Sequence, residues 1–251
     1  MLIVEGISVK LPAGLNPKEV QFCCHQLLFE KRQVIVGFSN GTIAIYRRRI
    51  DTNTLQEVVD SKPQLLQGHT GKITRLLLVR EEGQGADALL ISASADRTVR
   101  IWDPSVKDVS KMCIQTLRGH GGTVSAVAFC EGVLITASTD RTIKLWGAEP
   151  GRDLMLYSWF TPQQTLADLD CWVHDIALQM GENGALFVGD EHGDLSAYKV
   201  EKALASAAGS APPVQLMRWR RQAKAHSLGI TTLVLVEEEQ MLITLGYADC
   251  H

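Results

Sequence analysis

The sequence predicts an all-β fold built from repeated four-stranded antiparallel sheets. Two nearly identical stretches carry this prediction: Ser-Ala-Asp96-Arg-Thr-Val-Arg-Ile-Trp102 and Ser-Thr-Asp140-Arg-Thr-Ile-Lys-Leu-Trp146. The spacing from Trp102 to Trp146 falls within the roughly 40–45 residues that one four-stranded repeat unit occupies. In each copy a polar turn precedes alternating apolar residues, which is typical of a hairpin leading into a half-buried strand. The internal repeat therefore determines the fold class.

Composition excludes several other classes of protein. The 251 residues are 45% hydrophobic and 21% charged, as in a globular chain with a sizeable core. A net charge of −3 gives no overall attraction to nucleic acid or to an anionic membrane. The N-terminus lacks the build of a signal peptide, and no apolar run approaches 18 residues. We expect a cytoplasmic protein, with a nuclear or ciliary location left open, and reduced thiols at its six cysteines.

These motifs resemble the WD40 repeat family, in which each unit is one blade of a β-propeller. The resemblance implies a buried hydrogen-bond series in each blade, which runs from the hairpin Asp to a His, then to a Ser or Thr, and finally to the Trp indole. Such a series satisfies every buried polar atom that it includes. The implied sets are His69, Ser92, Asp96 and Trp102 in one repeat, and His120, Thr136, Asp140 and Trp146 in the next.

Weaker copies of the motif flank these two repeats. The segment that ends at Tyr46 has Asn40 at the Asp position and Val36 at the hydroxyl position. The segment that ends at Tyr198 has His192 and Val188 at the same two places. We expect apolar packing to hold these blades together instead. A further copy begins at Ala225-His226.

Placing strands on these copies gives a map of blades. Four would be complete, at about 18–67, 72–117, 123–166 and 172–219, with a partial fifth at about 229–251. The N-terminal segment 1–11 is left as an outer strand that would close a ring. Because an open arc would expose apolar faces and strand edges, we expect a larger ring of about seven blades. Further blades, a partner or a second copy of the chain would complete it.

Two chemical readings compete with a structural role for the motif residues. An Asp, His and Ser set imitates a hydrolase triad, but the set recurs in two successive repeats and has no Gly-x-Ser-x-Gly turn. The acidic segments 190–194 and 168–175 imitate metal sites, yet the first falls on a hairpin turn and the second on an inner strand. We expect no catalytic residues, no metal and no cofactor.

Insertions and charged patches suggest where partners bind. Segments 47–63, 81–87, 148–162 and 201–213 are expected to be loops on one rim of the disc, where such insertions often form a partner surface. Two basic patches could hold phosphate or nucleic acid. They are Arg47-Arg48-Arg49, and Arg218, Trp219, Arg220 and Arg221 with Lys224.

The opposite rim has candidate partner residues at the start of the inner strands. They are Glu19, Lys72, Thr123 and Trp172, surrounded by Ser39, Ala95, Thr139 and Glu191. In similar propellers these positions face the central opening and dock peptides, and Trp172 would be the anchor. We therefore expect a non-catalytic scaffold for protein–protein interactions, without insertion into a membrane. The alternatives are an adaptor that recognises a peptide or substrate, as in a ubiquitin-ligase complex, and an RNA-associated assembly factor.

Overall fold

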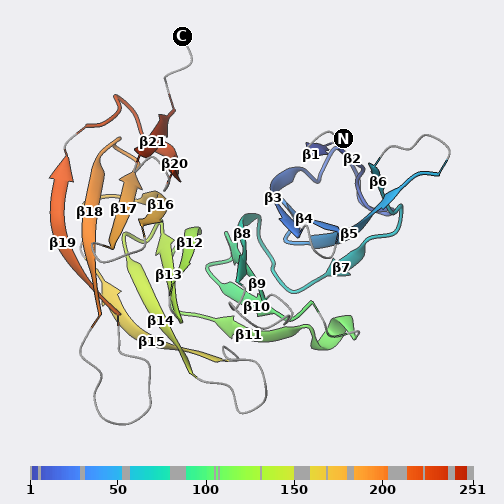
Figure 1. The fold of residues 1–251 in the computed structure, drawn as a ribbon, viewed down its shortest axis with the longest axis horizontal. Coiled ribbons are helices and arrows are strands. Elements are labelled where there is room, and N and C mark those ends of the chain that lie inside the picture. The colour runs from blue at the N-terminus through green and yellow to red at the C-terminus, as the bar shows by residue number, and fades with distance from the viewer. Residues whose placement is uncertain are drawn as a thin grey trace. The chain divides into compact units, whose positions relative to one another are not determined.

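The computed structural model shows an all-β chain of consecutive antiparallel sheets (Figure 1). It describes residues 2–4, 7–28, 32–52, 57–79, 89–104, 106, 108–130, 132–149, 159–167, 169–179, 184–202, 214–222, 224–236 and 241–247. The chain divides into two compact units, Met1–Arg118 and Gly119–His251. Within these ranges, no helix is long and apolar enough to span a membrane.

Unit 1 contains two complete sheets. The strands of the first are β3 (Phe22–Leu28), β4 (Gln33–Phe38), β5 (Ile43–Ile50), β6 (Glu57–Val59) and β7 (Gln64–Leu66). The strands of the second are β8 (Ile73–Val79), β9 (Leu89–Ser94), β10 (Val99–Trp102) and β11 (Cys113–Leu117), with the short 3-10 helix η1 (Val109–Lys111) before β11. In the first sheet β5 pairs with β7 along its first half and with β6 along its second half.

Unit 2 contains two further four-stranded sheets and a hairpin. The third sheet consists of β12 (Val124–Cys130), β13 (Val133–Ser138), β14 (Ile143–Glu149) and β15 (Trp159–Leu166). The fourth consists of β16 (Val173–Gln179), β17 (Ala185–Asp190), β18 (Leu195–Lys202) and β19 (Val214–Gln222). Each sheet is ordered as its strands follow in the chain, and β20 (Ile230–Val236) pairs with β21 (Met241–Gly246).

The second strand of each sheet forms the centre of the apolar core. Every residue of β9 and of β13 is buried, because these strands are covered on both faces. Branched aliphatic residues dominate them, as expected for strands that pack on two sides. Ile35, Ile73 and Leu90 share one cluster in unit 1, and Ile135, Val173 and Leu186 share one in unit 2.

Four hairpins between the second and third strands have the same turn. In each, the last residue of the second strand donates its amide to the carbonyl four residues later, as Ser94 does to Thr98. The third residue of the turn has a positive φ, which is 84° at both Gly41 and Gly193. In the two motif repeats arginines adopt this conformation instead, with φ 71° at Arg97 and 64° at Arg141. The hairpins therefore present the motif residues in a constant geometry.

The N-terminal segment differs from the expected single outer strand. It forms two short strands, β1 (Leu2–Val4) and β2 (Ile7–Val9), which pair with each other. Val9 is fully buried in the cluster that includes Phe38, and the Tyr46 hydroxyl donates a hydrogen bond to the Lys10 carbonyl at 2.6 Å. These contacts attach the segment to the first sheet of unit 1. Closure of a ring by this segment stays a prediction.

Insertions 47–63 and 148–162 contain strand residues, although all four insertions were expected to be loops. Segment 47–63 contains β6, which extends the first sheet, and β14 and β15 both reach into segment 148–162. β15 begins at Trp159 and β19 continues to Gln222, so both outer strands are longer than expected. Segment 81–87 and residues 203–213 lie outside the described residues.

Candidate functional site

The second sheet contains the complete hydrogen-bond series of the first motif repeat. His69 Nδ1 lies 2.8 Å from Asp96 Oδ2, and His69 Nε2 lies 2.8 Å from Ser92 Oγ. The Trp102 indole donates to the same Ser92 oxygen at 2.8 Å. Because the Asp96 carboxylate can only accept, a neutral His69 carries its proton on Nδ1, and its Nε2 accepts from the Ser92 hydroxyl. The series joins the loop before β8 to β9 and β10.

The third sheet repeats this geometry. His120 contacts Asp140 at 3.0 Å and the Thr136 hydroxyl at 2.8 Å, and Trp146 donates to that hydroxyl at 2.9 Å. Asp140 also accepts the amides of Gly121 and Thr142, so its carboxylate organises the hairpin as well as the histidine. A second copy with nearly equal distances indicates that the arrangement is a property of the repeat.

Burial and hydrogen bonding set the protonation states of this network. Burial lowers the pKa of His69 and outweighs the hydrogen bond to Asp96, which raises it. Burial alone would raise the pKa of Asp96, but hydrogen bonds from Thr98, the Thr70 amide and His69 lower it to about 2. Both shifts favour a neutral imidazole that donates to an ionised carboxylate.

The same geometry argues against a hydrolase triad. Ser92 and Thr136 are fully buried, and each hydroxyl oxygen already accepts an indole N–H. A nucleophile must reach the substrate carbonyl, and neither oxygen is accessible. These sets therefore hold strands together.

Sequence reasoning missed two further positions of the network. Thr98 donates its hydroxyl to Asp96 at 2.6 Å, and Thr142 donates to Asp140 at 2.7 Å. The Ser94 hydroxyl accepts the Asp96 amide and donates to the Gly71 carbonyl. The signal was present in the sequence, because Ser94-x-Asp-x-Thr recurs as Ser138-x-Asp-x-Thr.

The flanking repeats use other interactions at the same positions. Val36 and Val188 are buried where the motif repeats have a hydroxyl, in agreement with apolar packing. Asn40 accepts the Thr42 amide, which is the turn role of the motif Asp. In the β20–β21 hairpin, His226 Nε2 contacts Thr244 Oγ1 at 2.6 Å, so this hairpin contains the imidazole and the hydroxyl of the series.

Asp190 performs this turn role in the fourth sheet. Its carboxylate accepts the amides of His192 and Asp194, both at 2.9 Å. Asp175 accepts the Leu233 amide at 2.9 Å. Among the described residues, no three His, Cys, Asp or Glu side chains are grouped so that they could hold a metal ion, and Asp168 lies outside those residues.

The candidate partner positions are marked by one backbone hydrogen bond that recurs in the first, second, third and fourth sheets. The amides of Ala95, Thr139 and Glu191 donate to the carbonyls of Lys72, Thr123 and Trp172, respectively. The matching bond in the first sheet runs from Ser39 to Gln21 at 2.9 Å, so Gln21, and not Glu19, occupies the equivalent position. The placement of Glu19 was wrong because Glu19 lies in a turn, where its amide bonds to Asn16.

The side chains at these candidate partner positions differ in how far they are exposed to solvent. Trp172 is 50% exposed, and its amide donates to the Glu191 carboxylate at 3.3 Å. Lys72 is exposed and Thr123 is half-buried. Glu191 also lines a cavity of about 330 Å³ with His192, Asp194, Lys224, Ser227 and Leu228. The fourth sheet therefore presents an exposed indole whose backbone partner, Glu191, also lines a polar cavity.

The two basic patches have different surroundings. Arg48 pairs with Glu57, and Arg49 pairs with Asp60 at 3.2 Å, so β6 and the residue after it supply carboxylates to this patch. In the other patch Arg218 is exposed on β19. The side chains of Trp219, Arg220 and Arg221 lie outside the described part of the structure, and a nucleic-acid role for them stays a prediction.

Comparison with known proteins supports the assignment of the repeats. The model of the WD domain, G-beta repeat, matches residues 61–103 and 111–147, which include the two hydrogen-bond series. The lysosomal-trafficking regulator of Homo sapiens is 33% identical over 100 residues, which are 39% of this chain and 2% of that protein. The DENN domain and WD repeat-containing protein SCD1 of Arabidopsis thaliana is 38% identical over 84 residues, 31% of this chain and 7% of the relative.

A third relative is the nuclear distribution protein PAC1 of Scheffersomyces stipitis. It is 31% identical over 102 residues, which are 38% of this chain and 18% of that protein. The chain thus spans less than a fifth of the length of each of these relatives. The matched segments, the four-stranded sheets and the two hydrogen-bond series agree with one another, and residues 61–103 and 111–147 of this chain are WD40 repeats.

Proposed function

We propose that this chain is a non-catalytic scaffold that binds protein partners, and that Trp172 is the anchor for one of them. The proposal rests on the half-exposed indole of Trp172. Glu191 holds the backbone of this residue at two points, because its amide donates to the Trp172 carbonyl and its carboxylate accepts from the Trp172 amide. A large aromatic side chain on a rigid backbone loses little conformational entropy on binding, and tryptophan is enriched among the residues that dominate interface energies.

The surroundings of Trp172 favour a partner segment with a basic side chain. The Glu191 carboxylate bonds to the backbone amide of Trp172, so an acidic group and an exposed aromatic ring belong to the same corner of the sheet, and a cation can interact with both kinds of group. The relatives support a general docking role. Segments similar to this chain occupy 2%, 7% and 18% of three proteins with different names, so the repeats are a module that different proteins share. The proposed scaffold would thus use its repeats to dock basic segments.

The test compares two tryptophans of equal exposure. Trp159 is also 50% exposed but lies at the start of β15, away from the rim hairpins of its sheet. Proteins bound to the full chain would be quantified by affinity capture for the wild type, Trp172→Ala and Trp159→Ala. We expect a subset of partners to be lost only with Trp172→Ala, with affinity reduced about 30-fold or more for a purified member of that subset. Equal losses in both variants, or no loss in either, would contradict the proposal.

A further inference from the structure

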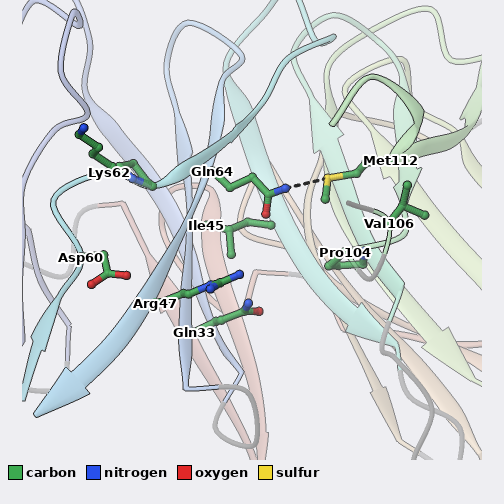
Figure 2. A pocket seen from close by; sticks show the side chains of 10 residues that line it. Gln33, Ile45, Arg47, Asp60, Lys62, Gln64, Pro104, Val106 and Met112 are labelled. Atoms are coloured by element: carbon green, nitrogen blue, oxygen red, sulfur yellow. Dashed lines mark hydrogen bonds between the residues drawn. The ribbon is translucent and has the colours of Figure 1, made fainter. Parts of the chain in front are cut away.

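Unit 1 contains a cavity of about 490 Å³ between its first sheet and the segment that connects β10 to β11. One wall comes from β4, β5 and the residues around β7, and the other comes from Pro104, Val106 and Met112 (Figure 2). Binding sites for small ligands and peptide side chains have volumes of this order, about 300–1,000 Å³. All residues that line this cavity belong to unit 1, whereas Trp172 belongs to unit 2.

The cavity has an excess of positive charge. Arg47 and Lys62 both line it and are exposed, and neither forms an ion pair within the described residues. The carboxylate of Asp60 also lines it, but Arg49 compensates that charge through a 3.2 Å contact. Of the three consecutive arginines, two therefore pair with acids of the same sheet and Arg47 remains for a ligand.

An acceptor beside Arg47 lacks a donor. Gln33 lies directly opposite Arg47 on the paired strands β4 and β5, so their side chains share one face of the sheet. The Gln33 Oε1 atom is buried and has no hydrogen-bond partner in the described structure. In Figure 2 the Arg47 guanidinium and the Gln33 amide extend toward the same side, below Ile45. A buried acceptor without a donor is unfavourable, and a ligand N–H would satisfy it.

The remaining lining is apolar or weakly bonded. Ile45 is 3% exposed and forms part of the floor, while Pro63, Pro104 and Val106 provide apolar walls. The Gln64 side-chain amide donates to the Met112 sulfur at 3.6 Å, which is a weak interaction that a carbonyl oxygen could replace. The site thus combines a cation, an unsatisfied acceptor, a replaceable donor bond and apolar contact surface.

We propose that this cavity binds a short segment of a partner protein that carries a carboxylate side chain. The carboxylate would pair with Arg47 and Lys62, a backbone N–H would donate to Gln33 Oε1, and an apolar neighbour would contact Val106 and Met112. A peptide can bring an apolar side chain to the walls together with its carboxylate and a backbone N–H, whereas phosphate has no apolar part, so a peptide matches the site better than phosphate alone. This inference goes beyond the scaffold proposal, because it assigns a second site with the opposite charge preference.

The experiment uses the intact chain and a random heptapeptide phage library as the probe. Enriched peptides would be synthesised with a fluorescent label and their Kd measured by anisotropy against wild type, Arg47→Glu and Lys62→Glu. Lys18→Glu is the matched control, because Lys18 is exposed, lies in unit 1 and makes the same change in net charge. Circular dichroism would verify that each variant is folded, which is expected since all three side chains are exposed.

The proposal expects Asp or Glu beside an apolar residue in the enriched peptides. It also expects a Kd at least tenfold weaker for Arg47→Glu and Lys62→Glu, and a change of less than twofold for Lys18→Glu and Trp172→Ala. Four results would overturn it: no acidic enrichment, equal weakening by all three charge variants, loss of binding with Trp172→Ala, or displacement by phosphate but not by chloride at equal ionic strength. A failure of the Trp172 proposal leaves these expectations unchanged.

Discussion

Replacing Thr136 by valine tests whether the polar network stabilises its sheet. Thr136 is fully buried on β13, and its hydroxyl oxygen joins the His120 imidazole to the Trp146 indole. Valine keeps the branched shape and the strand preference but removes that oxygen, so two buried polar groups lose their partner. Thr136→Val therefore separates the hydrogen bonds from the packing.

The expected loss follows from the two groups that remain. His120 and Trp146 have exposed fractions of 8% and 5%, so water can replace the lost bonds only poorly. An unsatisfied buried group is unfavourable by about 1–3 kcal/mol, and two such groups give a loss of about 2–6 kcal/mol in the free energy of unfolding. This is a large share of the roughly 5–15 kcal/mol that stabilises a typical domain.

Urea unfolding followed by tryptophan fluorescence would measure this loss. With a slope of about 1–3 kcal/mol per molar urea, the midpoint should move by at least about 0.7 M. Thr123→Val is the matched control, because Thr123 belongs to the same sheet and its hydroxyl makes no hydrogen bond to the described residues. It should change the free energy by less than about 0.5 kcal/mol. Equal shifts for the two variants would refute the reasoning.

Three further predictions follow from the structure. Burial lowers the folded-state pKa of His69 below 6.5, so on acidification this imidazole is protonated in the unfolded chain before it is protonated in the folded chain. Protonation therefore favours the unfolded state, and the urea midpoint should fall as the pH drops below about 6.5. The folded-state pKa of Asp96, about 2 against 3.8, adds a second fall between those two pH values, and a midpoint that stays constant from pH 7 to 2 would contradict both shifts. Gly41→Ala should be more destabilising in thermal melts than Gly14→Ala. Both glycines have a positive φ, 84° and 91°, so the backbone strain of alanine is similar at the two positions. The added Cβ would lie 2.5 Å from a backbone oxygen at Gly41 but would meet nothing within 4 Å at Gly14. Burial raises the pKa of Cys24 to about 12, so mass spectrometry should show slow alkylation by iodoacetamide at pH 8 in the folded chain and fast alkylation in urea.

The sequence predicted the parts of the structure that depend on residue identity within one repeat. Ser92 and Thr136 could be assigned before any coordinates through the resemblance to WD40 repeats, and in the two copies each lies the same number of residues from its Asp and from its Trp. The all-β class followed from the same copies. Thr98 carried an equally regular signal, and its role was missed because the turn motif was attributed to the aspartate alone.

The remaining features depend on contacts that spacing does not encode. Gln21 takes the position assigned to Glu19 because hydrogen bonds to Asn16 hold residues 17–19 in a turn before β3. β6 forms because Glu57–Val59 pairs with the second half of β5, a pairing that the repeat pattern does not include. The cavity near Arg47 combines residues from four separate segments, so no local pattern announces it.

The placement of Ser92 on β9 also restricts how the strands of its sheet can align. Ser92 lies opposite Arg100 on β10, and in this alignment its hydroxyl reaches both His69 and Trp102. A shift of β9 by one residue would turn the hydroxyl to the other face of the sheet and leave both rings without a partner. At the same position in the first sheet, Val36 imposes no such penalty, since any apolar side chain of similar size can fill its place. The polar series thus makes one register of β9 against β10 far more favourable than the registers shifted by one residue, a selectivity that apolar packing alone does not provide.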